Sequence, residues 1–213
     1  MAKIFTCLSK KKNKDLGLVS KAKLLKLIES EELVITPLLE DTQVGAISID
    51  LRVGTDFLAL KQGRDEMIDT TTNAKNSRPI KGHFSETRRR LGESFLLHPG
   101  QIILFSTLEY LKLPEDIYAD LSLRSSYSRI GLNLSTIIQP GYCGCASIEL
   151  VNSSNTSIKI MSGARLVQAR FYRIKSNQEY FGKKRKYNCQ VRPVSSKANE
   201  DIELIKLIEL TKS

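Results

Sequence analysis

The chain has 213 residues, of which 41% are apolar and 26% are charged, a composition typical of a soluble globular domain rather than of a disordered segment. No apolar run approaches the roughly 18 residues that a membrane-spanning helix needs, which argues against a transmembrane protein. The first residues turn from apolar to lysine-rich, the reverse of the order in a secretory signal peptide. Four cysteines are too few for a disulfide-based scaffold. We therefore expect a cytoplasmic protein.

The formal net charge of +10 is concentrated in two short segments. Residues 1–17 contain five lysines and one aspartate, and residues 173–192 contain seven lysines or arginines and one glutamate, whereas the charges elsewhere balance. We interpret the first segment as a solvated extension. For such basic segments there are two sharper interpretations, a contact with nucleic acid or a site for a phosphorylated small molecule.

A helix followed by a series of strands is predicted for most of the chain. Ser20 is a suitable N-cap, and the helix should end near Glu31 after an apolar stripe formed by Leu24, Leu25, Leu27 and Ile28. From Leu33 onward, short β-like runs alternate with turn residues, at 46–53, 95–97, 102–106, 117–123, 146–151, 157–160 and 166–174. Strands of this length and spacing predict a mainly β fold with a barrel-like or jelly-roll-like body.

The remaining segments predict appendages to this body. Residues 61–92 are polar and indicate a long surface insertion, and the composition of residues 175–198 indicates a mobile basic arm. Asn199 should cap a final helix with an acidic first turn and an apolar face of Ile202, Ile205 and Ile208. The predicted organisation is a basic extension over 1–17, a β domain over 18–174, an arm over 175–198 and a helix over 199–213.

Motifs for metals, cofactors and covalent catalysis are weak or missing. Cys143 and Cys145 share one face of a predicted strand, but a zinc site needs two further ligands. His83 and His98 stand in no ligand-like spacing, and the H-x-E and P-C-x-x-C motifs of zinc-dependent nucleobase deaminases do not occur. The sequence also lacks a G-x-S-x-G elbow and Walker or dinucleotide-binding motifs. We therefore expect no structural or catalytic zinc.

The segment Leu121–Leu132 carries the first candidate site. A predicted strand leads into Arg124, Ser125 and Ser126, and Arg129 follows. Two guanidinium groups that flank hydroxyl and backbone N–H groups can hold an oxyanion, because the planar guanidinium matches phosphate oxygens. A helix N-cap with solvated arginines explains the same residues equally well.

The segment Gln139–Asn152 carries the second candidate site. A Pro-Gly turn precedes a predicted strand in which Cys145, Ser147 and Glu149 share one face and Ile148 takes the other. A carboxylate beside small residues leaves room for a ligand, and a desolvated Glu149 is a candidate general base. Because a glutamate in a strand is commonly just solvent-facing, this motif alone leaves the choice open.

Five motifs together are similar in order and spacing to those of the dCTP deaminases, which belong to the trimeric dUTPase-like superfamily. They are Gly45–Gly54, Phe95–Gly100 with the Leu113-Pro114 turn, Arg124–Leu132, Pro140–Leu150 and Gly163–Gln168. Tyr180, Lys186, Tyr187 and Gln190 also resemble the arm that closes over the nucleotide in this family. The resemblance extends from about Leu18 to about Pro193, which is most of the chain.

The resemblance implies a dUTPase-like distorted β-barrel or jelly-roll body with short terminal helices, assembled as a homotrimer with sites at subunit interfaces. The implied reaction is hydrolytic deamination of dCTP to dUTP and ammonia, without a catalytic metal but with Mg²⁺ accompanying the triphosphate. Glu149 would shuttle protons, while Ser125 and Arg129 would position the attacking water. The nucleotide would be bound by Arg124, Ser126, Tyr127, Ser128, Gln139, Ser147, Ile148, Tyr180, Lys186 and Gln190. No membrane or nucleic-acid partner is expected.

One position departs from the family pattern. Where the deaminases and dUTPases usually have an aspartate before the Pro-Gly turn, this chain has Gln139, and glutamine cannot take up a proton. This argues against dUTPase activity and against a bifunctional deaminase–dUTPase, whereas Gln139 can still hydrogen-bond a sugar hydroxyl. The segment between Arg129 and Gln139 is also shorter than in some members. Two alternatives stay open: a catalytically weak, regulatory nucleotide-binding relative, and a nucleic-acid-binding protein that uses Lys10–Lys14 and Lys183–Lys186.

Overall fold

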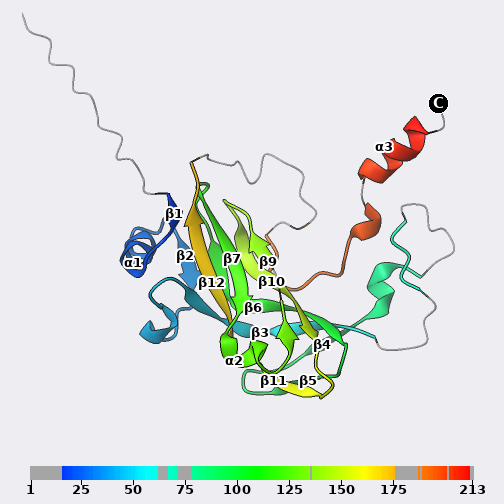
Figure 1. Ribbon diagram of the computed structural model, residues 1–213, viewed down its shortest axis with the longest axis horizontal. Helices are drawn as coiled ribbons and strands as arrows, with labels where there is room; N and C mark the ends of the chain where they lie inside the picture. The colour runs from blue at the N-terminus through cyan, green and yellow to red at the C-terminus, as the bar shows by residue number, and fades with distance from the viewer. Residues whose placement is uncertain are drawn as a thin grey trace, which may run out of the picture.

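The computed structural model describes residues 16–61, 67–71, 78–134, 136–175, 187, 189–200 and 202–211. Strands dominate this part of the chain (Figure 1). Its helices are α1 (Lys21–Glu29), α2 (Ser125–Ser128) and α3 (Ile202–Leu210), with 3-10 turns η1 (Asp41–Gln43), η2 (Ile80–His83) and η3 (Ala198–Glu200). Its strands are β1 (Gly17–Leu18), β2 (Val34–Thr36), β3 (Ile49–Leu60), β4 (Phe84–Arg88), β5 (Ser94–Leu97), β6 (Ile102–Lys112), β7 (Ile117–Leu123), β8 (Leu132–Asn133), β9 (Thr136–Ile138), β10 (Cys143–Asn152), β11 (Ile158–Met161) and β12 (Arg165–Arg173). The prediction of a mainly β fold is confirmed.

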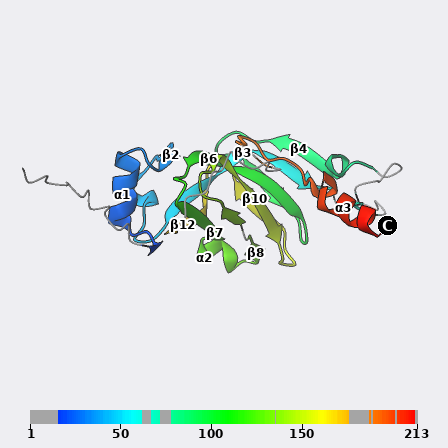
Figure 2. The same ribbon diagram turned by 90° about the horizontal axis from the view of Figure 1, so that it is seen from above.

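Most strands belong to one large antiparallel sheet. Its main path runs β8-β10-β6-β3-β12-β7-β9, while β1, β2 and β4 pair with β12, β6 and β3. Strands β5 and β11 form a separate two-stranded sheet. The large sheet curls into a half-barrel, with α1 and α3 at opposite ends of the molecule (Figures 1 and 2). The curl brings β9, at one end of the path, against β10 near the other end.

The core fills the inside of this curl. In β7, buried and half-exposed residues alternate along the whole strand, as expected for a strand with one face on the core. Phe57 of β3 stacks on Phe95 of β5, with ring centroids 5.3 Å apart, and Phe105 of β6 packs beside them. This aromatic group joins the small sheet to the large one.

Several element boundaries differ from the sequence predictions. In α1, Leu24 and Leu27 are buried, but Leu25 is 45% exposed, so the apolar stripe is narrower than predicted. Strand β3 continues to Leu60, and the polar insertion predicted for 61–92 contains β4, which pairs with β3. The polar sequence of β4 gave no signal for a strand. Pairing with β3 satisfies its backbone hydrogen-bonding groups.

The C-terminal end also differs in detail. Asn199 lies inside η3 rather than directly before the helix, and α3 begins at Ile202. The side chains of the predicted apolar face, Ile202, Ile205 and Ile208, lie outside the described residues, as do residues 1–15 of the basic extension predicted over 1–17. No helix within the described ranges is long and apolar enough to cross a membrane.

A buried carboxylate connects β6 with η1 and with β3. Glu109 of β6 is fully buried and accepts hydrogen bonds from the Arg52 backbone N–H at 2.8 Å and from Gln43 Nε2 at 3.1 Å. Gln43 Oε1 in turn accepts from the Leu39 backbone N–H at 3.0 Å. Burial raises the pKa of Glu109 above its ordinary range, although these hydrogen bonds oppose the shift.

Candidate functional site

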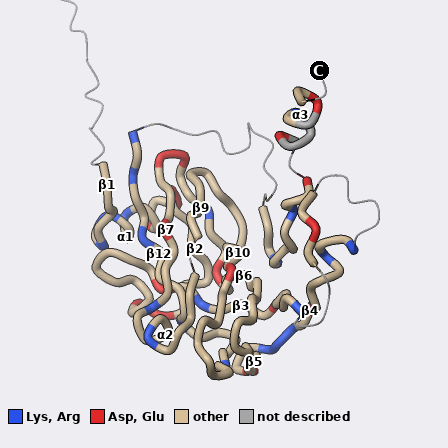
Figure 3. Tube along the Cα trace, turned by 45° about the vertical axis from the view of Figure 1, so that its right-hand side comes forward, with Lys and Arg blue, Asp and Glu red and all other residues tan. Residues whose placement is uncertain are grey.

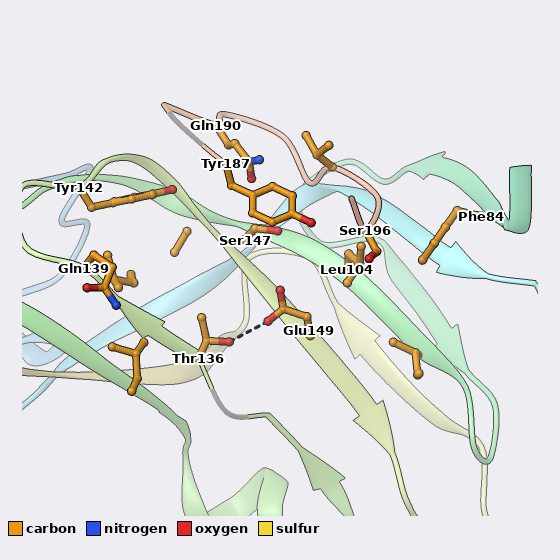
Figure 4. A pocket seen from close by; sticks show the side chains of 15 residues that line it. Phe84, Leu104, Thr136, Gln139, Tyr142, Ser147, Glu149, Tyr187, Gln190 and Ser196 are labelled. Carbon is orange, nitrogen blue, oxygen red and sulfur yellow. Dashed lines mark hydrogen bonds between the residues drawn. The ribbon is translucent and has the colours of Figure 1, made fainter. Parts of the chain in front are cut away.

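A pocket of about 670 Å³ opens where β9 and β10 approach each other. Strands β4, β6, β9 and β10 build its floor and walls, and residues from the C-terminal part of the chain lie over it (Figure 4). The lining residues are Phe84, Ile102, Leu104, Thr136, Ile137, Ile138, Gln139, Tyr142, Ala146, Ser147, Glu149, Tyr187, Gln190, Val194 and Ser196. The pocket therefore combines one largely apolar wall with a row of polar groups.

Glu149 is the acidic group of this pocket. Its side chain projects from β10 and is exposed, whereas Ile148 and Leu150 on either side are fully buried. The predicted alternation along this strand is confirmed. Thr136 of β9 donates a hydrogen bond from Oγ1 to Glu149 Oε2 at 2.9 Å (Figure 4). One carboxylate oxygen is thus oriented by the opposite end of the sheet.

Small and amide side chains lie beside Glu149. Ser147 precedes it on the same face of β10, and Gln139 follows β9 at the turn into β10. That turn is anchored, because the Gly141 N–H donates to the Pro114 carbonyl at 3.0 Å and the Tyr142 hydroxyl donates to the Cys145 carbonyl at 2.7 Å. Hydrogen-bonding side chains therefore line the pocket next to Glu149, at a turn that is held in place.

The other wall is apolar. Phe84 of β4 and Ile102 and Leu104 of β6 face the pocket, and Val194 lies among the residues that cover it. Apolar walls with a few convergent polar groups are typical of small-molecule sites. Tyr187, Gln190 and Ser196 complete the cover (Figure 4).

The arginine- and serine-rich segment forms the end of β7 and the short helix α2. Arg124 is the N-cap residue of α2, and Ser125, Ser126 and Ser128 are exposed on it, as is Arg129 directly after it. Tyr127 packs partly against the core. None of residues 124–129 lines the pocket that contains Glu149. The structure therefore does not bring the two candidate segments into one pocket within a single chain.

Arg124 is already engaged with the body of the protein. Its Nε lies 3.3 Å from Asp50 Oδ2, its Nη1 donates to the Arg165 carbonyl at 3.3 Å, and its side chain is 37% exposed. Basic residues lie at α2 in Figure 3, since Arg124 and Arg129 cap its two ends. An anion bound here would share Arg124 with Asp50.

The remaining predicted residues divide into three groups. Ser147, Gln139 and Gln190 line the pocket with Glu149. The Ile148 side chain does not, because the strand alternation directs it into the core. Tyr180 and Lys186 lie outside the described residues. In the part of the chain that the structure describes, no group of three or more His, Cys, Asp or Glu residues is arranged to hold a metal ion.

Sequence reasoning missed Thr136 and the apolar wall. Thr136 lies in a three-residue strand, and only the curl of the sheet brings it to Glu149. Phe84 lies in a segment predicted as a surface insertion. An apolar phenylalanine between polar stretches was the available signal for it.

Comparison with known proteins gives consistent matches. A family model described as dCTP deaminase-like matches residues 18–174. A dUMP-forming dCTP deaminase of Dictyoglomus turgidum is 34% identical over 184 residues, covering 83% of this chain and 92% of the relative. A dUMP-forming dCTP deaminase of Methanobrevibacter smithii is 30% identical over 90% of this chain and 100% of the relative. A dCTP deaminase of Halorubrum lacusprofundi is 32% identical over 87% of this chain and 93% of the relative.

Among solved structures, the crystal structure of 2'-deoxycytidine 5'-triphosphate deaminase from Agrobacterium tumefaciens has a similar fold. The TM-score is 0.58 at 22% sequence identity, over 75% of this chain. The match spans only 49% of the Agrobacterium chain, about half of its length. At this identity the similarity concerns the fold.

Proposed function

Because the chain belongs to the dCTP deaminase-like family, we propose that it hydrolyses dCTP to dUTP and ammonia with Glu149 as the proton-transferring group. The observation that carries this proposal is the carboxylate of Glu149, held at 2.9 Å by Thr136 in a pocket with Ser147 and Gln139. A base needs a fixed orientation toward the water that it activates, and the Thr136 hydroxyl supplies it.

Proton transfer follows from this arrangement. Glu149 removes a proton from the water that attacks the amine-bearing carbon of the cytosine ring and passes protons to the ring nitrogen and the leaving amine. Since Thr136 donates to Oε2, Oε1 is the oxygen left to face the water. Ser147 and Gln139 are within the pocket to hydrogen-bond the base and the sugar.

A second copy of the chain would complete the site. Ser125 and Arg129 are exposed and do not line the pocket, yet the family pattern assigns them to the attacking water. We infer a homotrimer in which α2 of a neighbouring copy lies against the pocket. Ile130, next to α2, and Ile137, in the pocket wall, are 49% and 59% exposed, and contact between copies would bury such apolar surface.

The triphosphate would be bound by the basic end of the site, with Arg124 and Ser126 as its contacts. Mg²⁺ prefers oxygen ligands and usually binds with substrate phosphates rather than in a cage of protein side chains. We propose the same mode here, with Mg²⁺ bound through the phosphate oxygens of the nucleotide. Mg²⁺ would neutralise phosphate charge while Glu149 acts on the base.

Gln139 suggests that the reaction stops at dUTP. Two of the relatives named above are described as dUMP-forming, and release of dUMP from dUTP requires a second hydrolysis. Gln139 lines the pocket but has no basic oxygen to activate a second water. Identifying the nucleotide product is therefore the most informative single measurement.

The experiment is a product assay by chromatography with Mg²⁺ and, separately, dCTP, CTP, dCMP and dUTP. We expect conversion of dCTP to dUTP without dUMP, and we expect Gln139→Asp to be the variant in which dUMP can appear. Formation of dUMP by the unmodified protein would overturn the role of Gln139. Binding of dCTP without conversion would favour a regulatory nucleotide-binding protein.

The shared site has its own test. Glu149→Gln and Arg129→Ala proteins should each be inactive alone. After the two are mixed and reassembled, some sites combine an intact Glu149 from one copy with an intact Arg129 from another. Recovered activity supports the shared site, and no recovery from reassembled mixed trimers contradicts it.

A further inference from the structure

Two cysteines from distant parts of the chain meet next to Tyr142 and Gln190, which line the pocket. Cys143 is the first residue of β10, and Cys189 lies 46 positions later, with 3.0 Å between the two Sγ atoms. Both are free thiols, and Cys189 is exposed while Cys143 is half-buried. A disulfide has an S–S length of about 2.05 Å, so an approach of roughly 1 Å separates this pair from a covalent bond.

The backbone holds the two partners in register independently of the thiols. The Cys145 N–H donates to the Gln190 carbonyl at 2.7 Å. Between the cysteines of β10 lies Gly144, with φ of +139°, where a Cβ would stand 2.5 Å from the Gln190 carbonyl oxygen. Only glycine permits this approach, so the residue that follows Cys189 is held against β10 directly beside the thiol pair.

Residues 189–196, here the covering segment, form part of the pocket. Gln190, Val194 and Ser196 line the pocket, and Gln190 and Ser196 lie across it from Glu149 (Figure 4). The next residue continues the anchorage, because the Lys197 backbone N–H donates to the Tyr187 hydroxyl at 2.9 Å. A bond between Cys143 and Cys189 would therefore fasten the covering segment to the strand that carries Glu149.

We propose that Cys143 and Cys189 are a thiol-modification site, at which a small-molecule disulfide such as oxidised glutathione drives formation of an intramolecular disulfide that fixes the covering segment over the pocket. The exposed Cys189 thiolate attacks the glutathione disulfide, forming a mixed disulfide and releasing one glutathione. The Cys143 thiolate then displaces the second glutathione. The protein loses two protons and two electrons, and one oxidised glutathione becomes two reduced molecules.

The local chemistry sets the conditions of this exchange. The hydrogen bond with Cys143, together with burial, raises the pKa of the Cys189 thiol, so the reactive thiolate becomes more abundant as the pH rises. Burial and the nearby Glu109 carboxylate raise the pKa of Cys145, and the Cys145 thiol is half-buried, whereas Cys189 is exposed. Cys145→Ser is therefore a matched control on the same strand.

The effect on the pocket rests on the proposed function, whereas the disulfide does not. Ligand exchange requires the pocket to open, and a tethered covering segment opposes opening. We expect nucleotide to dissociate more slowly from the oxidised protein than from the reduced protein. Reduction should restore the original rate.

The test uses the full chain in glutathione buffers of increasing oxidation. We expect the number of titratable thiols to fall from four to two and peptide mapping without reductant to recover a Cys143–Cys189 crosslink. The crosslink should persist in Cys145→Ser and vanish in Cys143→Ser and Cys189→Ser. No crosslink, a crosslink to another cysteine, or zinc bound by the reduced thiols would overturn the proposal.

A second measurement separates the two parts of the inference. Release of bound dCTP is followed by stopped flow in Glu149→Gln protein, which is expected to bind dCTP without turnover, in its reduced form, in its oxidised form and in its oxidised form with Cys189→Ser added. Slower release is expected only from the oxidised chain that has both cysteines, and equal rates despite a confirmed crosslink would overturn the effect on the pocket. If the protein binds no dCTP, the proposed function fails while the crosslink result stands.

Discussion

The pocket wall around Glu149 and the segment around α2 both contain candidate catalytic residues, but they hold these residues differently. Glu149 projects from a ten-residue strand with paired neighbours and is oriented by Thr136. Ser125 and Arg129 belong to a four-residue helix and its end, exposed and outside the pocket. Glu149 thus belongs to a pocket wall that is formed within one chain, whereas Ser125 and Arg129 are exposed outside that pocket. The difference supports the proposal that each chain supplies two halves of different sites rather than one complete site.

The largest expected effect comes from changing Glu149 in the pocket wall. Glu149→Gln keeps the shape of the side chain and its place in the pocket but cannot accept a proton. We expect turnover of dCTP to be lost while dCTP binding is retained, measured by product formation and by calorimetry. Normal turnover would remove Glu149 from the mechanism, and Glu115→Gln, at an exposed glutamate in a turn, is the control.

Among the residues at α2, Arg124 should affect binding more than catalysis. Arg124→Ala removes a guanidinium from the proposed phosphate site, and we expect triphosphate binding to weaken by about 2 kcal/mol, roughly thirtyfold in Kd. Arg170→Ala is the control, because Arg170 is likewise paired with an aspartate, at 3.6 Å from Asp120, and its side chain is 35% exposed. Equal affinities of the two variants would contradict the phosphate role.

The framework beneath the pocket is tested through Glu109. Glu109→Gln places an amide donor against the Gln43 amide or the Arg52 N–H, and we expect the free energy of unfolding to fall by about 1–3 kcal/mol. The raised pKa of Glu109 means that the folded state holds this proton more tightly than the unfolded chain. The stability contributed by Glu109 is therefore full below the ordinary carboxyl pKa and falls as the pH rises through the raised value.

The measurement is urea unfolding of the wild-type chain and Glu109→Gln across a pH series. The stability difference between them should shrink as the pH rises through that window. A difference that stays constant would show that Glu109 does not titrate differently in the two states.

The smallest expected effect concerns orientation. Thr136→Val removes the hydroxyl that donates to Glu149 Oε2, and the loss of about 1 kcal/mol would lower kcat roughly fivefold with little change in KM. Thr136→Ser should restore kcat, because it keeps the donating hydroxyl. An unchanged kcat in Thr136→Val would contradict the orienting role of Thr136.

Features of the fold and of the site that depend on neighbouring residues in the sequence could be predicted, whereas contacts between distant segments could not. Strand β7 was predicted at its observed bounds because its alternation is regular, and the direction of Glu149 followed from the same periodicity in β10. The contact between Thr136 and Glu149 and the ion pair between Arg124 and Asp50 were not predicted. Both arise from how the strands are ordered and curled, which local patterns do not encode.

The meeting of β9 and β10 also sets the local stability of the pocket. Strand β9 has three residues and pairs in the sheet with β7, so it can separate from its neighbours at a small cost compared with unfolding the core. Such an opening would release Thr136 and reshape the wall around Glu149 without disturbing the aromatic group formed by Phe57, Phe95 and Phe105. Backbone amides of β9 should therefore exchange with solvent well before those of β3 and β6, and a bound nucleotide should slow that exchange selectively.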